Sequence, residues 1–104
     1  MGFTFKENCP DIRNTRVIDV YDELVESNLH VDVYDPWVKD GDMNEKINFI
    51  KEIPSNYYDA IIIAVAHDEF KKMSKLDFEK LCKINNVIYD LKYVLNADES
   101  DLRL

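Results

Sequence analysis

The residues best placed for chemistry lie near the start of this 104-residue chain, where Lys6, Arg13 and Arg16 surround a turn-forming Asn-Cys-Pro-Asp run. The pattern predicts the end of a strand at residues 2–6 and a helix over residues 15–27. The free backbone N–H groups at a helix N-terminus favour anions. Lysine adds a point charge, and arginine can bind phosphate with two hydrogen bonds. These residues therefore predict a site for an anionic group.

The same loop also allows a purely structural role. Asp11 and Arg13 could tie the loop together while Lys6 faces solvent, and spacing alone favours neither interpretation. Lys92 follows the final predicted strand and would lie at the same sheet edge as Lys6. Taken by itself, Lys92 is interpreted as an exposed lysine.

Three other residues are weaker candidates for chemistry. Cys9 could be a nucleophile, but no base is identifiable beside it, so a loop-filling thiol is favoured. His67 ends a buried strand, and a hydrogen-bonded structural role is favoured over acid–base work. Asp35 could hold a ribose, but the glycine fingerprint of dinucleotide sites is absent, which favours a turn-forming role. No two histidines or cysteines have metal-ligand spacing, which predicts no metal.

Composition excludes several classes of protein. The apolar share of 46 % and the charged share of 33 % are typical of a single soluble domain. A net charge of −8 argues against nucleic acid as a partner. The longest apolar run, residues 60–66, is too short to span a bilayer, and no signal peptide is recognised. The two cysteines are expected to be reduced thiols of a cytoplasmic protein.

The predicted elements that position these residues alternate between strand and helix. Phe3 and Phe5 are expected on one face of the first strand, and Asn14 or Thr15 is the expected N-cap of the first helix. The later strands are expected at residues 29–34, 47–50, 59–66 and 87–91, and helical segments within 38–46 and at 68–73 and 75–84, before an acidic tail. Residues 59–66 are apolar on both faces, as parallel strands are. This order predicts an α/β, Rossmann-like domain of three layers, with a mostly parallel sheet and a truncated first strand.

Four stretches resemble one enzyme family. GFTFKENCPDIRNTRVIDVYDEL at residues 2–24 and VDVYDPW at 31–37 resemble the C-terminal domain of the UDP-glucose/GDP-mannose dehydrogenase family. AVAHDEF at 64–70 and VIYDLKYVL at 87–95 resemble its UDP-N-acetylhexosamine branch, which feeds capsule and O-antigen synthesis. The resemblance implies oxidation of UDP-sugars to uronic acids for surface polysaccharide, with NAD as the cofactor.

The resemblance also implies roles for individual residues. Phe5 and Lys6 would contact the sugar and phosphate of a UDP-sugar, and Arg13 would reach across a cleft to NAD. Lys92 falls where related UDP-glucose enzymes have an arginine that helps to bind the UDP-sugar, although lysine cannot bind in a bidentate way. Cys9 is not the family's catalytic cysteine, so no catalytic residue is expected in this chain.

The sequence therefore predicts that residues 1–104 are the UDP-sugar-binding, C-terminal fragment of a nucleotide-sugar 6-dehydrogenase, inactive by itself. The expected partners are the N-terminal and central domains of the parent enzyme, where most of the NAD contacts would lie, and a second copy in a homodimer. No membrane, nucleic acid or metal is expected as a partner. Two alternatives stay open, namely a small non-catalytic flavodoxin-like signalling or interaction domain and a free-standing thiol enzyme that uses Cys9.

Overall fold

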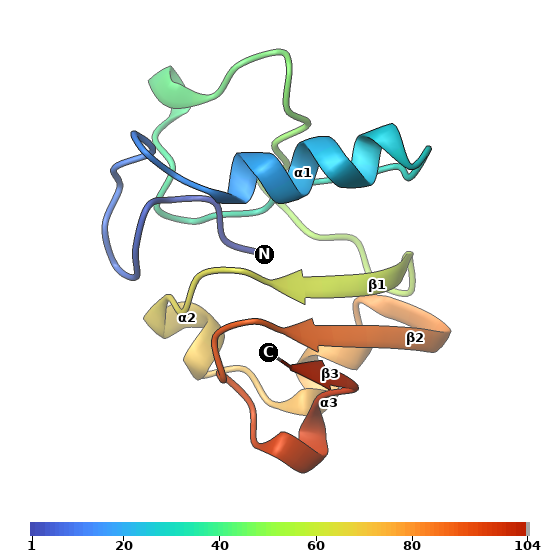
Figure 1. Cartoon of the computed structure of the whole chain (residues 1–104). Coiled ribbons are helices and arrows are strands. Elements are labelled where there is room, and N and C mark those ends of the chain that lie inside the picture. Colours follow the sequence, from blue (N-terminus) through green and yellow to red (C-terminus); the bar gives the residue numbers. More distant parts are fainter. Residues whose placement is uncertain (104) are drawn as a thin grey trace.

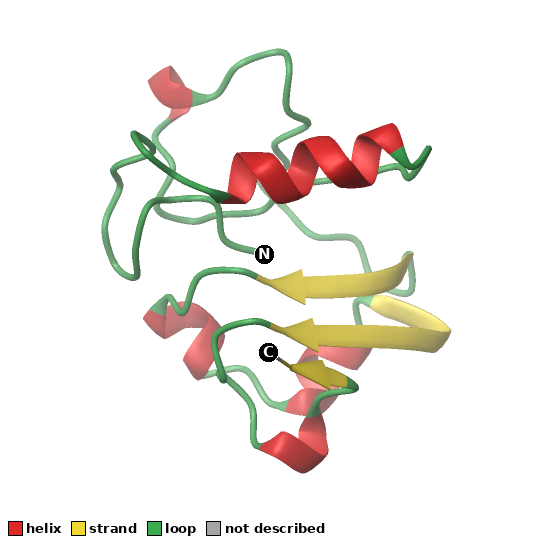
Figure 2. Ribbon diagram, viewed as in Figure 1, coloured by secondary structure: helices red, strands yellow, loops and turns green. Residues whose placement is uncertain are grey.

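A parallel sheet forms the centre of the computed structural model, which describes residues 1–103. Its three strands lie in the order β1-β2-β3, as Figures 1 and 2 show. They comprise β1 (Tyr58–Ile63), β2 (Cys82–Asp90) and β3 (Leu102–Arg103). β1 and β2 are in parallel register, with Ile61 opposite Ile88. The Rossmann-like α/β class predicted from the alternation of strand and helix patterns is thereby confirmed.

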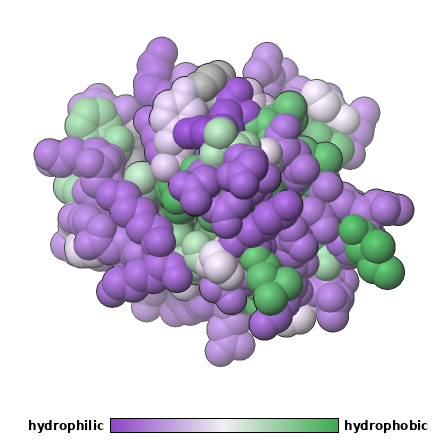
Figure 3. Space-filling view, turned by 90° about the horizontal axis from the view of Figure 1, so that it is seen from below, coloured by the Kyte–Doolittle hydropathy of each residue, from purple (hydrophilic) through white to green (hydrophobic). Residues whose placement is uncertain are grey.

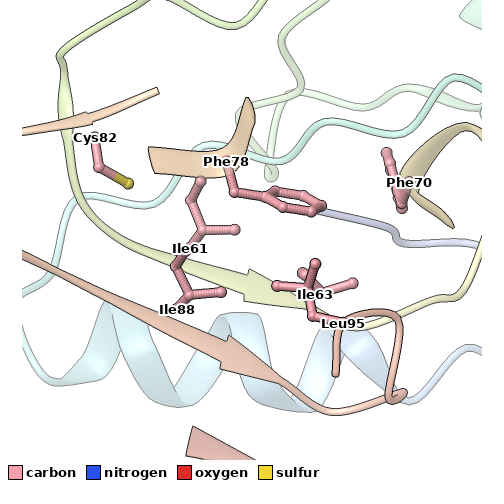
Figure 4. Close-up of a cluster of buried hydrophobic side chains, with 7 residues drawn as sticks. All are labelled: Ile61, Ile63, Phe70, Phe78, Cys82, Ile88 and Leu95. Carbon is pink, nitrogen blue, oxygen red and sulfur yellow. The ribbon is translucent and has the colours of Figure 1, made fainter. Parts of the chain in front are cut away.

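Helices cover both faces of this sheet. They are α1 (Val17–Glu26), α2 (Asp68–Lys71) and α3 (Lys75–Glu79), with short 3-10 turns at η1 (Asp40–Asp42) and η2 (Ala97–Glu99). On one face, Phe70 of α2 and Phe78 of α3 pack in a buried cluster with Ile61, Ile63 and Ile88 (Figure 4). On the other face, α1 packs through Tyr21 in a second cluster that includes Phe3 and Val33.

Residues 1 and 2 occupy the centre of the sheet although no regular strand forms there. The Met1 amino group donates to the Ile62 carbonyl at 2.6 Å, and the Ala64 N–H donates to the Met1 carbonyl at 2.8 Å. On the other side, the Gly2 N–H donates to the Tyr34 carbonyl at 2.9 Å. This is the pattern of a parallel strand, so the start of the chain lies centrally, between residues 31–34 and the end of β1.

Gly2 is required by this crowded position. Its φ is +92°, which L side chains rarely adopt. A Cβ added there would lie 2.7 Å from the Cβ of Val65. The start of the chain can therefore pass close to the end of β1 only because residue 2 has no side chain.

The outer part of the sheet is less regular than the sequence predicted. The predicted strands at 29–34 and 47–50 are reduced to one parallel bridge between Val33 and Phe49. Val33 donates to the Asn48 carbonyl at 2.9 Å and accepts from the Ile50 N–H at 2.9 Å. These bonds place residues 31–34 between residues 48–50 and the start of the chain.

Three local predictions were wrong. The predicted helix 75–84 ends at Glu79, because Cys82 already begins β2. The predicted acidic tail folds back instead, and Asp101 binds Ile88 through its N–H at 3.0 Å and its carboxylate at 2.8 Å. Arg16, and not Asn14 or Thr15, is the N-cap of α1.

The surface seen from the side of β3 is mainly hydrophilic, with apolar side chains in small separate groups (Figure 3). Such an arrangement is ordinary for a small domain. Within residues 1–103, no helix is both long enough and apolar enough to cross a membrane.

Candidate functional site

Three loops meet at the carboxyl edge of the sheet, toward which the arrows of β1 and β2 point in Figure 1. They are residues 4–16, which lead into α1, residues 64–67, which follow β1, and residues 91–95, which follow β2. In open α/β sheets, ligands bind outside the carboxyl ends of the strands. The residues of this edge are therefore the first place to look for a site.

The Asp35 carboxylate holds the first of these loops to the sheet. Its side chain is fully buried. Its Oδ2 atom accepts hydrogen bonds from the N–H groups of Phe3 at 2.6 Å and Thr4 at 3.0 Å, and Oδ1 accepts from the Trp37 N–H at 2.7 Å. His67 Nε2 lies 2.9 Å from Oδ2. Asp35 therefore has the structural role that its turn-forming sequence context favoured.

The His67 imidazole continues this network, and both of its nitrogens are used. Nδ1 accepts a hydrogen bond from the Asn8 N–H at 2.9 Å, so the ring proton belongs on Nε2, which donates to Asp35. The Thr4 hydroxyl lies 3.2 Å from the same Nε2 atom. His67 is 0 % exposed. The favoured interpretation of His67 as a structural histidine is confirmed.

Asn8 joins the loop to α2. Its side-chain oxygen accepts from the Asp68 N–H at 2.9 Å, and its backbone adopts φ of 54°. Asparagine tolerates this left-handed conformation better than most residues. One residue thus sets both the turn of the loop and its attachment to α2, of which the sequence predicted only the turn.

This network presents Phe5 and Lys6 to solvent at the carboxyl edge. The Phe5 N–H donates to the Asp11 carbonyl at 2.7 Å, which closes the loop, and the Thr4 hydroxyl donates to the Lys6 carbonyl at 3.2 Å. Phe5 is 53 % exposed whereas Phe3 is 3 % exposed. The prediction that the two phenylalanines share a face was therefore wrong, because the chain leaves the extended conformation between them.

Arg13 binds Asp11 rather than standing free. Its Nε and Nη2 atoms lie 3.0 Å from the two oxygens of the Asp11 carboxylate, and its side chain is 84 % exposed. The pKa of Asp11 lies below its usual value because the Arg13 guanidinium donates these hydrogen bonds. The structure thus contains the loop-tying pair that was one of the two sequence interpretations.

Lys92 is exposed in the loop after β2. The buried Asp90 carboxylate shapes that loop by accepting from the N–H groups of Lys92 at 3.2 Å, Val94 at 3.1 Å and Leu95 at 2.8 Å. The end of β1 lies between the end of β2, from which this loop starts, and residues 1 and 2, from which the first loop starts. Lys6 and Lys92 share the edge but belong to separate loops.

Within residues 1–103, the cysteines and acidic residues do not form a second candidate site. Cys9 is half-buried in the loop. Cys82 lies in the core, and burial raises the pKa of its thiol. No group of three or more histidine, cysteine or acidic side chains in residues 1–103 is arranged to hold a metal ion.

The fold defines a class of protein, the Rossmann-like α/β domains, in which ligands bind outside the carboxyl ends of parallel strands. The chain belongs to the UDP-glucose/GDP-mannose dehydrogenase family, since residues 1–97 match the model of that family's UDP binding domain. This membership favours the dehydrogenase interpretation over the signalling-domain and thiol-enzyme alternatives.

Individual relatives agree with the family assignment. The chain is 52 % identical to the UDP-N-acetyl-D-glucosamine 6-dehydrogenase of Salmonella typhi and 54 % identical to that of Pseudomonas aeruginosa, in each case over 100 % of this chain and 25 % of the relative. A solved structure of the UDP-N-acetyl-mannosamine dehydrogenase Cap5O from S. aureus matches with a TM-score of 0.70 and 27 % identity, over 92 % of this chain and 22 % of that one. The chain thus spans about a quarter of the relatives' length, and it matches their C-terminal part.

Proposed function

We propose that residues 1–104 form the UDP-sugar-binding domain of an NAD-dependent UDP-N-acetylhexosamine or UDP-glucose 6-dehydrogenase. The observation that carries the proposal is the exposed Phe5–Lys6 pair, held at the carboxyl edge by the buried Asp35–His67 network. Support for the substrate class comes from the similarity to relatives named as UDP-N-acetyl-D-glucosamine 6-dehydrogenases. The partners are the other domains of such an enzyme and a second copy of it.

The proposed binding mode follows from the chemistry of the edge. The Lys6 ammonium pairs with a phosphate oxygen of UDP, and the exposed Phe5 ring packs against the sugar. Lys92 adds a second positive charge from the neighbouring loop. Because the whole chain carries a charge of −8, these local positive groups bind the anion against a repulsive background.

Arg13 is the proposed contact to NAD. Its guanidinium is highly exposed while two of its nitrogens bind Asp11, so the ion pair fixes its direction and leaves the outer face of the group accessible. NAD would accept hydride from the sugar in the intact enzyme. Within this chain we assign only binding and orientation, and none of the covalent steps.

An amide NMR titration of this chain with UDP tests the proposal. We expect shifts at residues 5–15 and at Lys92, and at least a roughly tenfold loss of affinity in Lys6→Ala, because a charge-assisted contact is removed. Lys80→Ala, which removes an exposed lysine at the end of α3, is the matched control and should bind normally. Equal binding by Lys6→Ala and the unmodified chain would reject the site.

The expected inactivity of the chain alone has its own test. When UDP-N-acetylglucosamine and NAD are mixed with the chain, absorbance at the NADH band should not rise above the protein-free rate. Steady formation of NADH would show that the chain contains catalytic groups that we have not assigned.

A further inference from the structure

Arg103 lies at the end of β3, on the same edge of the sheet as the candidate site. β3 pairs in parallel with β2, and Arg103 is opposite Asp90, the last residue of β2. The three strands run in the same direction in Figure 1, so β3 ends at the edge where β1 and β2 end. Arg103 is thus a cationic group of this edge to which the proposed binding mode gives no role.

The ring of Tyr93 fixes the orientation of the Arg103 side chain. The guanidinium carbon lies 4.1 Å from the centroid of that ring. Tyr93 belongs to the loop after β2 and is 55 % exposed, and Arg103 is half-buried. A guanidinium stacked on an aromatic face keeps its planar fork in one orientation, with its N–H donors around the rim of the plane. The guanidinium is therefore positioned before any ligand arrives.

Arg103 differs from the other two arginines of the chain in its lack of an acidic partner. Arg13 pairs with Asp11, and Arg16 pairs with Asp19. Within residues 1–103, no Asp or Glu side chain forms an ion pair with Arg103, although the chain has 21 acidic residues against 13 basic ones. In a protein so rich in carboxylates, this guanidinium is available to an anion from outside the chain.

The acidic residue opposite Arg103 in the strand register is used elsewhere. Asp90 is 0 % exposed, and its carboxylate accepts from the N–H groups of Lys92 at 3.2 Å, Val94 at 3.1 Å and Leu95 at 2.8 Å. Both of its oxygens are thus bound to the backbone of the loop. Asp90 shapes the loop and leaves the positive charge of Arg103 without a partner.

The Nε atom of Arg103 also lacks a hydrogen-bond partner. Among residues 1–103, this atom and the Ser100 hydroxyl oxygen are the two buried side-chain nitrogen or oxygen atoms without one. Buried polar groups are nearly always hydrogen-bonded, and an unpaired one calls for a partner from outside the chain, such as an ion or a water molecule. The guanidinium therefore has both a charge and a donor to satisfy.

Lys92 adds a second positive charge to the same part of the edge. It follows Asp90, the register partner of Arg103, by two residues, and it is exposed. No acidic side chain within the described residues 1–103 forms an ion pair with it. A phosphate group carries more than one negative charge and several acceptor oxygens. A planar fork and a flexible point charge together suit such a group.

We propose that Arg103 and Lys92 form a phosphate-binding subsite at the ends of β3 and β2, with Tyr93 as the residue that positions the guanidinium. The Arg103 Nη atoms donate two hydrogen bonds to phosphate oxygens, and the Lys92 ammonium pairs with the remaining charge. The inference rests on the proposed function for the identity of the ligand. UDP has two phosphates, so Lys6 binds one of them and the subsite binds the other.

The Nε–H signals of the three arginines in a ¹⁵N NMR spectrum test the subsite directly. The signal of Arg103 is identified by its absence from the Arg103→Lys variant. UDP and inorganic pyrophosphate should both shift this signal, whereas uridine, which has no phosphate, should not. The proposal would be overturned if UDP and pyrophosphate left the signal in place, or if uridine shifted it as far as UDP.

Affinity for UDP separates the roles of the side chains. Arg103→Gln removes the fork and the charge and should weaken binding about tenfold or more, and Arg103→Lys, which keeps the charge, should lose less. Tyr93→Leu removes the stacked ring and should weaken binding about threefold, whereas Tyr93→Phe keeps an aromatic face and should retain it. Lys80→Gln removes one exposed charge at the end of α3 and is the matched control, with normal binding expected.

Failure of the subsite and failure of the proposed function give different results. If Lys6→Ala weakens UDP binding but Arg103→Gln binds like the Lys80→Gln control, the subsite is overturned and the function stands. If the unmodified chain does not bind UDP but pyrophosphate shifts the Arg103 signal, the function is rejected and the phosphate subsite stands. If Arg103→Gln does not fold, Arg103→Lys and the shifts in the unmodified chain decide the question.

Discussion

The two ends of one seam, between residues 29–34 and β1, are built in opposite ways. At the carboxyl end, residues 1–4 fill the seam, and the buried Asp35 and His67 side chains bind its backbone. At the amino end the same walls enclose an apolar groove, bridged by the hydrogen bond between Tyr58 and Asp32. A polar network thus fixes the end where the proposed ligand binds, and the end far from it depends on apolar contacts.

This difference means that the geometry of the candidate site does not depend on the apolar groove. A buried network whose members are all hydrogen-bonded holds one geometry, because any other arrangement leaves polar groups unpaired. An apolar groove has no such requirement, so the positions of its walls are less tightly fixed. The loop that carries Lys6 is therefore expected to keep its conformation when the walls of the groove move.

The largest effect should come from breaking the closed end with Asp35→Ala. The change leaves the N–H groups of Phe3 and Thr4 and the His67 ring without their buried acceptor. We expect a loss of about 3–5 kcal/mol in the free energy of unfolding, measured by urea denaturation. Asp59→Ala removes a carboxylate that is 82 % exposed and is the control, with little expected change. A loss as small as that of the control would mean that the network does not hold the seam.

The stability of the protein should depend on pH through the Met1 amino group, which lies where the two ends of the seam meet. Burial lowers the pKa of the Met1 amino group from 8.0 to about 6. The unfolded chain therefore binds more protons between these values, so stability should rise as the pH increases from 6 to 8, by at most about 3 kcal/mol. Thermal unfolding across this range measures the change, and acetylation of the amino group should flatten it. A fall in stability over the same range would contradict the prediction.

A smaller effect should come from the bridge at the open end. Tyr58→Phe removes the hydroxyl that donates to Asp32, a bond that also raises the pKa of Tyr58 together with burial. We expect a loss of about 1 kcal/mol on urea denaturation. Tyr57→Phe alters the neighbouring, more exposed ring and should cost less. If the two variants lose the same stability, the bridge does not help to hold the walls.

The smallest effect concerns the exposed loop. Arg13→Ala removes the hydrogen bonds that lower the pKa of Asp11, so that pKa should rise toward its ordinary value. An NMR titration of the Asp11 carboxyl carbon measures it, and Arg16→Ala, which removes the partner of Asp19, is the control. Stability should hardly change, because exposed ion pairs contribute little. An unaltered pKa in Arg13→Ala would show that the pair does not form in solution.

Local sequence patterns predicted the elements that form from the pattern of their own residues. The spacing of Val17, Val20 and Leu24 predicted α1, and the run of isoleucines predicted β1. The fold-back of residues 96–103 was missed, because Asp101 finds Ile88 through a contact that no local pattern encodes. The same cause explains why Ala60 in β1 is exposed, since an apolar run does not specify which segments pair with it.

The site was predicted in part for the same reason. The exposed positions of Lys6 and Lys92 follow from their places after strands, and the structure agrees. The bond from Asn8 to His67 was not foreseen, because it joins residues 59 positions apart. The roles of Phe5, Lys6, Arg13 and Lys92 toward ligands came from the family resemblance and stay predictions.

The long sequence separations within the seam also affect how the protein is made. The bonds from Met1 to Ile62, from Phe3 to Asp35 and from Thr4 to His67 join residues 61, 32 and 63 positions apart. Closing such loops is slow compared with forming a helix. During synthesis the first loop leaves the ribosome before His67 does, and it cannot reach its final shape until His67 has emerged and β1 can form beside it. A segment that is made before β1 is thus ordered only after β1 exists.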